Sequence, residues 1–172
     1  MKKRIGIVLV LVVALLVTGC ESKTNSGGSK KGGILNNNKT MTCTYEETDS
    51  NGYKTSEKMV ITYNSKKVIK VFQTTTTEMD AMVTDFAISA GNDVAKAFDN
   101  VDGITLKYSQ VSTNTVKAEM EVVFDELKEE QIKQVIVDLY GENADTDNLF
   151  DQKEISIEDF KKENLEGYTC TD

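Results

Sequence analysis

The residues of this chain that could do chemistry are its three cysteines (Cys20, Cys43 and Cys170) and its 28 acidic side chains. Histidine is absent from the 172 residues. Without histidine, neither a Ser-His-Asp nor a Cys-His catalytic arrangement can form, and the most common zinc ligand is missing. We therefore predict a non-catalytic protein with no catalytic residue, no metal site and no cofactor.

Cys20 lies at the end of a segment typical of lipoprotein signals. Three basic residues near the N-terminus are followed by an apolar run from Ile5 to Val17, which is too short for a membrane span. The run continues into Val17-Thr18-Gly19-Cys20, a lipobox pattern in which small residues fit the signal peptidase. We expect residues 1–19 to be a signal peptide, with cleavage between Gly19 and Cys20 and lipidation of Cys20. A plain signal peptide with an incidental cysteine is the alternative.

Residues 20–40 are rich in Gly, Ser, Asn and Lys and lack a hydrophobic period. They predict a flexible tether that spans roughly 25 Å on average. A lipobox indicates a bacterium, so we expect the chain in the cell envelope, facing the extracytoplasmic side, with membrane lipid as its partner through acylated Cys20. Gram-positive and Gram-negative membranes both remain open, as does the oligomeric state.

Cys43 and Cys170 form an even pair in a chain predicted to leave the reducing cytoplasm. Both lie in short Thr- and Tyr-rich stretches, "MTCTY" and "YTCTD", at opposite ends of the predicted domain 41–172. If these stretches are neighbouring strands, the two Cβ atoms come within disulfide range. Two buried free thiols and a redox pair are the alternatives to this structural disulfide.

The predicted domain is strongly acidic. Residues 41–172 contain 27 acidic residues and 13 lysines, a net charge of −14. Nucleic acids bind proteins through Lys and Arg, so this charge excludes a nucleic-acid partner. The segment Asp145–Asp151 begins like a calcium loop, but Leu149 and Phe150 stand where an oxygen ligand and a glycine belong. We interpret the polar segment 142–154 as a solvated acidic loop, with a weak cation site as its alternative.

The first half of the domain predicts three strands and a helix. Runs rich in Thr, Val, Ile and Tyr indicate the strands. From Met79 onward, apolar residues recur every three or four positions, which indicates the helix. The predicted strands are Met41–Glu47, Glu57–Tyr63 and Lys67–Thr77. The side chains predicted to face the core from the helix are Met79, Met82, Val83, Phe86, Ala90, Val94 and Phe98. Gly91 and Asn92 predict a kink or a break in this helix.

A hairpin is predicted after Asp102-Gly103, because apolar and polar residues alternate on both sides of Thr113–Thr115. Matching the two apolar faces pairs Leu106 with Val122 and Tyr108 with Met120. The same register places Lys107 opposite Glu121 and gives an odd-length loop of Thr113, Asn114 and Thr115, with Asn114 in a left-handed conformation.

The last part of the domain predicts two helices and a final strand. The first covers roughly Glu126–Tyr140 and ends at Gly141. The second follows Ser156, which is placed to cap it, and ends at Gly167. The fold predicted is α+β, an antiparallel sheet of about five to six strands with two to three helices on one face, in the order β-β-β-α-β-β-α-α-β.

Three stretches carry a family resemblance: "NSKKVIKV" (Asn64–Val71), "VDGITLKYSQVSTNTVKAEMEVVFDEL" (Val101–Leu127) and "ISIEDFKKENLEGYTC" (Ile155–Cys170). Together with the lipobox, the chain resembles the YehR-like family of bacterial lipoproteins. The resemblance implies a small α+β lipoprotein domain and no assigned activity. This chain departs from the family pattern in carrying Cys43 and Cys170.

The function predicted is that of a non-catalytic, lipid-anchored extracytoplasmic domain, a binding or envelope-accessory module. A small solute- or metal-binding lipoprotein is one alternative, which a pocket with convergent polar groups would favour. A carboxylate-dependent envelope hydrolase is the other, which two facing acids with raised pKa would favour.

Overall fold

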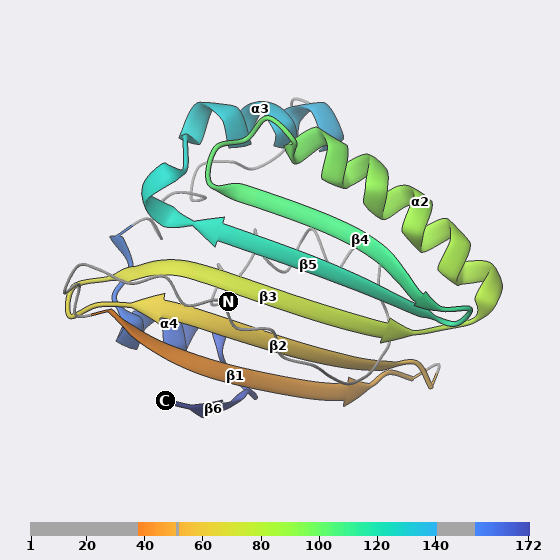
Figure 1. Cartoon of the computed structure of the whole chain (residues 1–172), viewed down its shortest axis with the longest axis horizontal. Helices are drawn as coiled ribbons and strands as arrows, with labels where there is room; N and C mark the ends of the chain where they lie inside the picture. Colours follow the sequence, from red (N-terminus) through yellow and green to blue (C-terminus); the bar gives the residue numbers. More distant parts are fainter. Residues whose placement is uncertain (1–37, 51, 141–153) are drawn as a thin grey trace, which may run out of the picture.

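The computed structural model describes residues 38–50, 52–140 and 154–172. Six strands form one sheet in the spatial order β4-β5-β3-β2-β1-β6, and every neighbouring pair is antiparallel (Figure 1). The strands are β1 (Lys39–Thr48), β2 (Lys54–Tyr63), β3 (Val68–Glu78), β4 (Ile104–Ser112), β5 (Thr115–Val123) and β6 (Thr169–Thr171). The three strands predicted in the first half are confirmed; β1 and β2 are longer than expected, and β3 is shifted by one residue.

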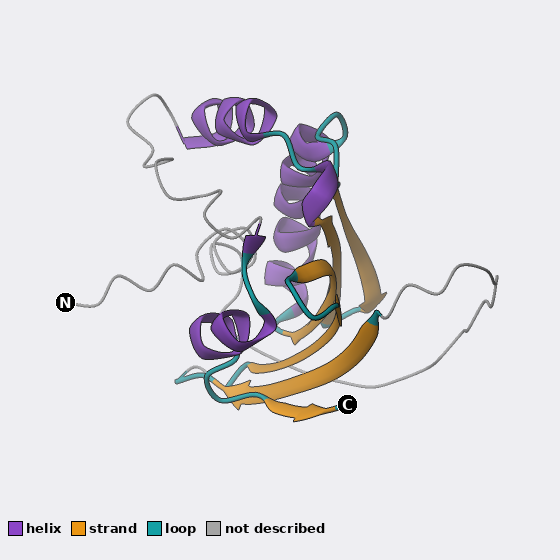
Figure 2. Cartoon of the chain, turned by 90° about the vertical axis from the view of Figure 1, so that its left-hand side faces the viewer, coloured by secondary structure: helices purple, strands orange, loops and turns teal. Residues whose placement is uncertain are grey.

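The helices lie on the concave side of the curved sheet, as Figure 2 shows. They are α2 (Ala81–Phe98), α3 (Glu129–Tyr140) and α4 (Ile157–Asn164), with a 3₁₀ turn η1 (Phe124–Glu126) before α3. We call the concave side the inner face and the opposite side the outer face. The order of elements and the placement of helices on one face confirm the predicted fold class.

Alternation along the strands separates the two faces of the sheet. One inner row runs across four strands through Met41, Ile61, Val71 and Val122, which are opposite one another and buried. Successive strand residues point to opposite faces, so the outer face receives the Thr and charged positions between them. Ion pairs join neighbouring strands there, such as Lys70 with Glu121 at 2.5 Å. The inner face therefore carries the core.

The predicted core stripe is confirmed at Met79 and Phe98, which are buried, and is wrong at three positions in the first half of α2. Met82 is 89% exposed and Phe86 is 71% exposed, and Val83 is also exposed. The helix instead buries Thr84, Ala87, Gly91, Ala95 and Phe98. Small residues at steps of four let the helix backbone approach the sheet closely, so packing selects them over the bulkier apolar side chains.

Gly91 marks the closest approach of α2 to the sheet. A Cβ atom at this position would lie 2.5 Å from ring carbons of Tyr108 on β4. Tyr108 is buried, so its ring fills the space that the missing side chain leaves. The helix runs unbroken from Ala81 to Phe98, and the predicted kink or break at Gly91 and Asn92 is wrong. Gly91 therefore allows α2 to pack closely against the Tyr108 ring.

The β4–β5 hairpin has the predicted faces but a different register. Tyr108 is opposite Ala118 and Leu106 is opposite Met120, a shift of two residues from the prediction that also places Lys107 opposite Glu119. A register change between Gln110 and Ser112 accompanies the shift.

The extra residue explains the shorter loop of this hairpin. Ser112 pairs with Thr115, so the connection has two residues in place of the predicted three. Without the irregularity, the observed register would leave a single residue to turn the chain. A bulge that inserts one residue, Val111, resolves this. A shift of two residues preserves which side chains face inward, so alternation alone could not detect it.

The C-terminal helices are confirmed in type and order, but α3 begins at Glu129 instead of Glu126 and α4 ends at Asn164, before Gly167. In α3, Ile132 and Val135 are buried, and Glu129 pairs with Lys133 at 2.7 Å as expected. Before α4, the Ser156 hydroxyl accepts a hydrogen bond from the backbone N–H of Asp159 at 3.1 Å. Gly141, where the first of these two helices was predicted to end, lies outside the described residues.

The chain reverses after α4 at Gly167, whose φ of +93° favours glycine. The reversal brings β6 alongside β1, with Cys170 directly opposite Cys43. The final strand and its position at the edge of the sheet are thus as the sequence predicts.

Candidate functional site

The predicted disulfide is present. The Cys43 and Cys170 sulfurs are 2.08 Å apart, and the two Cα atoms are separated by 4.0 Å. The bond closes a loop with a sequence separation of 127 residues and joins β6 to the first strand of the domain. The predicted bond between Cys43 and Cys170 is confirmed in place of two free thiols. Cys20 and Gly19, the predicted lipidation and cleavage residues, lie outside the described residues.

The acidic segment 142–154 also lies outside the described residues, except for Glu154. The Glu154 carboxylate accepts a hydrogen bond of 2.7 Å from the Lys67 ammonium, which contacts Asp125 at the same distance. Residues 38–50, 52–140 and 154–172 contain no cluster of three or more His, Cys, Asp or Glu side chains that could hold a metal ion.

A group of polar residues on the inner face was not predicted from the sequence. We call it the inner-face cluster, and it consists of Tyr45, Glu47, Glu57, Gln73 and Tyr168. Strand alternation places its members from β1, β2 and β3 on the same side as the buried core residues Cys43, Met59 and Val71. Glu57 lies between Tyr45 and Thr75 in the register.

Glu57 is at the centre of the cluster. The Tyr168 hydroxyl donates a hydrogen bond to Glu57 Oε2, and Gln73 Nε2 donates to the same oxygen at 3.0 Å. Tyr168 comes from the segment just before β6, so its contact with β2 depends on the chain reversal at Gly167. The two donors approach from opposite ends of the domain sequence.

A pair of tyrosines lies beside this carboxylate. The rings of Tyr45 and Tyr168 stack with centroids 5.2 Å apart and planes inclined by 30°. The Tyr45 hydroxyl donates to Glu47 Oε2 at 2.6 Å. The cluster therefore combines two carboxylates with an aromatic pair, all on the inner face.

The surroundings of Glu57 raise the pKa of its carboxyl group. Burial, which disfavours the charged form, is the main cause, and the negative charge of Glu47 adds to it. Hydrogen bonds from Tyr168 and Gln73 act in the opposite direction. Burial and the Glu57 charge also raise the pKa of the Tyr168 hydroxyl, which stays protonated and donates.

Gln73 contributes an unusual buried acceptor. Its side chain is 3% exposed, and its Nε2 donates to Glu57 and, at 3.4 Å, to the Thr75 hydroxyl. Within the part of the chain that the structure describes, its Oε1 has no hydrogen-bond partner. A buried carbonyl oxygen without a donor costs free energy, so this atom marks a place where a partner is expected.

The sequence did carry a signal for the cluster. Glu57 is in phase with Met59 and Ile61 along a predicted strand, and Gln73 is in phase with Val71. A carboxylate and an amide at inward positions indicate a buried polar site. The participation of Tyr168 carried no such signal, because it depends on how the chain folds back after α4.

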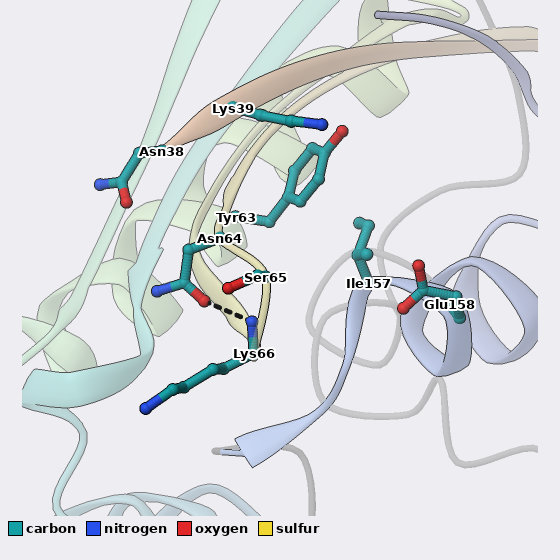
Figure 3. Close-up of a pocket in the computed structure, with 8 residues that line it drawn as sticks. All are labelled: Asn38, Lys39, Tyr63, Asn64, Ser65, Lys66, Ile157 and Glu158. Carbon is teal, nitrogen blue, oxygen red and sulfur yellow. Dashed lines mark hydrogen bonds between the residues drawn. The ribbon is translucent and has the colours of Figure 1, made fainter. Parts of the chain in front are cut away.

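A pocket of about 650 Å³ lies at a different place, where β1 begins (Figure 3). Asn38, Lys39 and Tyr63 line one side and Ile157 and Glu158 the other, with the β2–β3 turn between them. The turn is held by Asn64, whose Oδ1 accepts hydrogen bonds from the backbone N–H groups of Lys66 and Lys67. These hydrogen bonds of Asn64 explain the shape of the turn. Among the described residues that line this pocket, no buried side-chain N or O atom is without a hydrogen-bond partner.

The comparisons with known proteins support the fold. No protein-family model and no curated protein matches the chain. A solution structure of a protein from Streptococcus pneumoniae TIGR4 is similar with a TM-score of 0.53 and 13% identity, covering 90% of this chain and 98% of that one. The Escherichia coli YehR protein is similar with a TM-score of 0.52 and 13% identity, covering 78% of this chain and 92% of its own.

Neither neighbour's name states an activity or a ligand. The likeness is with YehR itself, which agrees with the resemblance found in the sequence. Within the described residues, no helix has the length and apolar character needed to cross a membrane. At this level of identity the neighbours establish architecture, and the chain has the fold seen in E. coli YehR.

Proposed function

We propose that this chain is a lipid-anchored, extracytoplasmic binding protein of the bacterial envelope. The observation that carries the location is the lipobox pattern Val17–Cys20 after a short apolar run. The disulfide between Cys43 and Cys170 supports it, because disulfides persist in oxidising compartments outside the cytoplasm. It also leaves Cys20 as the remaining cysteine of the chain.

The tether would join the domain to its membrane anchor at one end of the sheet. The tether joins the domain at Lys39, where β1 begins, and its lysines favour anionic headgroups. β1 then runs to Thr48, and Tyr45 lies six residues along it, about 20 Å from Lys39 at 3.3 Å per residue. The inner-face cluster therefore lies along β1 at some distance from the point where the tether joins the domain.

A binding role is supported by the inner-face cluster. It brings together hydrogen-bonding groups from three strands and an aromatic pair, and Gln73 supplies a buried acceptor without a described donor. Convergent polar groups of this kind are typical of small-molecule sites.

The location is tested by fractionating bacterial cells that express the full chain. We expect the wild type in the membrane fraction with incorporated labelled fatty acid, and Cys20→Ala without the label and released from the membrane. Cys43→Ala is the matched control, because it also removes a thiol but leaves the lipobox intact. Equal membrane retention and labelling of Cys20→Ala would contradict the proposal.

A carboxylate-dependent hydrolase is the second candidate function. The raised pKa of Glu57 and the nearby charge of Glu47 are the observation that favours it, since a general acid needs a pKa near the working pH. Hydrolysis of nitrophenyl glycosides or esters that disappears in Glu57→Gln and persists in Glu130→Gln would establish this activity in place of simple binding.

A further inference from the structure

The inner-face cluster presents oxygen acceptors that have no donor. Gln73 Oε1 has no hydrogen-bond partner among the described residues. Both hydrogen bonds to Glu57 reach Oε2, and within the described part of the chain none reaches Oε1. Gln73 Nε2 donates a hydrogen bond of 3.0 Å to Glu57 Oε2, so the side chains that carry the two acceptors are in direct contact.

The charge of the site favours a cation. No Lys or Arg in residues 38–50, 52–140 or 154–172 forms an ion pair with Glu57. The charge of Glu47 acts on it as well, which adds to the negative potential. The faces of aromatic rings such as Tyr45 and Tyr168 also attract cations.

The number and arrangement of the acceptors select the kind of cation. A metal ion would need more ligands than the described residues bring together. A guanidinium binds best when both oxygens of one carboxylate are open, but Glu57 Oε2 already accepts from Tyr168 and Gln73. An ammonium group has three separate donors and suits single oxygens on two different side chains.

We propose that the inner-face cluster binds the primary ammonium group of a small amine, with Glu57 Oε1 and Gln73 Oε1 as acceptors. This inference rests on the binding role proposed above and names its ligand class. Binding neutralises Glu57 and satisfies the buried amide oxygen at the same time. The Tyr45–Tyr168 pair forms the aromatic wall of the site.

The test is isothermal titration calorimetry of the full chain in mild detergent with n-butylammonium chloride. We expect a dissociation constant of about 1 mM or lower, in keeping with the few atoms of the probe. Tetramethylammonium, a cation without N–H donors, and n-butanol, a donor without charge, should each bind at least about ten times more weakly.

Single-residue variants test which side chains bind the amine. Glu57→Gln removes the charge with little change of shape, and Gln73→Leu removes the orphan acceptor; each should weaken binding about tenfold or more, with folding checked by circular dichroism. Glu130→Gln removes the same charge from an exposed position in α3 and should leave the affinity unchanged.

Binding should also weaken as the pH is lowered, because protonation removes the charge of Glu57. The groups that face it are Glu47, Tyr45 and Tyr168, and both tyrosines have raised pKa values. The two tyrosines stay neutral across the acidic range. The loss of affinity in the wild type should therefore be larger than that in Glu57→Gln.

Three results would overturn the proposal: no binding of butylammonium, equal binding of tetramethylammonium, or unchanged affinity in Glu57→Gln. The first would mean that an ordered water satisfies Gln73 Oε1, and the second that the acidic surface attracts any cation. The fractionation of Cys20→Ala gives an independent answer, so a failed amine site and a failed membrane location are distinguished.

Discussion

The two ends of the inner face are built from the same strands but differ in chemistry. At the tether end, where β1 begins, the row formed by Met41, Ile61 and Val71 is apolar and buried. At the far end, the row four residues further along β1 contains Tyr45, Glu57 and Thr75. The first row holds the fold together, whereas the second retains polar groups at a cost in stability. Polar groups kept at such a cost are expected where a ligand binds.

Removing the disulfide should give the largest loss of stability, because the bond holds β6 against β1 between the two ends of the inner face. For the double variant Cys43→Ala/Cys170→Ala we expect a loss of roughly 3–5 kcal/mol in the free energy of unfolding, since a long loop is no longer closed in the unfolded chain. Urea denaturation measures it. Release of β6 should also withdraw Tyr168 from Glu57 and weaken amine binding; unchanged stability would contradict the structural role.

The next largest effects should come from substitutions within the two rows, and the loss of stability should differ between the rows. Ile61→Ala at the tether end should cost about 2–4 kcal/mol, because Ile61 is fully buried and a cavity would remain. Thr75→Val at the far end keeps the shape of a buried side chain and should change the stability by less than about 1 kcal/mol. Urea denaturation of both variants tests this, and equal losses would remove the distinction between the rows.

Gly91→Ala tests how α2 packs over the sheet. The new methyl group would clash with the buried Tyr108 ring, and we expect a loss of about 1–3 kcal/mol despite the higher helix propensity of alanine. Thermal unfolding measures it. Phe86→Ala, in the same helix but exposed, is the control and should change the stability by no more than about 0.5 kcal/mol. A stabilising Gly91→Ala would show that the helix lies farther from β4.

The smallest effect is the pH dependence that Glu57 contributes. Its pKa is raised in the folded state, so the folded chain holds a proton that the unfolded chain releases as the pH rises above about 4.5. Stability from this group is therefore present at low pH and is lost as the pH rises through the folded pKa. Glu57→Gln should be more stable than the wild type at pH 7, with the difference shrinking towards pH 4.

The measurement is urea denaturation of both proteins across this pH range. Glu130→Gln should show no such trend, because its carboxylate is exposed on α3. A difference between Glu57→Gln and the wild type that does not vary with pH would mean that burial does not affect Glu57 in the way described. It would also remove the electrostatic contrast between the two ends of the inner face.

Much of the fold could be predicted because its signals are local. Alternation indicated the strands and their faces, Ser156 indicated the start of the last helix, and Gly167 indicated the chain reversal that follows it. The register of β4 with β5 could not be predicted, because a shift of two residues leaves the same side chains inward and Val111 absorbs the difference. The predicted core face of α2 was wrong at Met82, Val83 and Phe86, because the sheet there packs against the small residues Thr84, Ala87 and Gly91.

The sequence by itself determined the order of elements and the lipoprotein signal pattern, since each depends on residue types at fixed spacing along the chain. It indicated the pairing of Cys43 with Cys170 because lipidation of Cys20 would leave these two cysteines. Only the tertiary structure decided that Tyr168 reaches Glu57 and that Gln73 retains an acceptor without a described partner. These contacts join residues up to 111 positions apart. Such pairs form only when the strands are in register and β6 folds back on β1, so no local pattern specifies them.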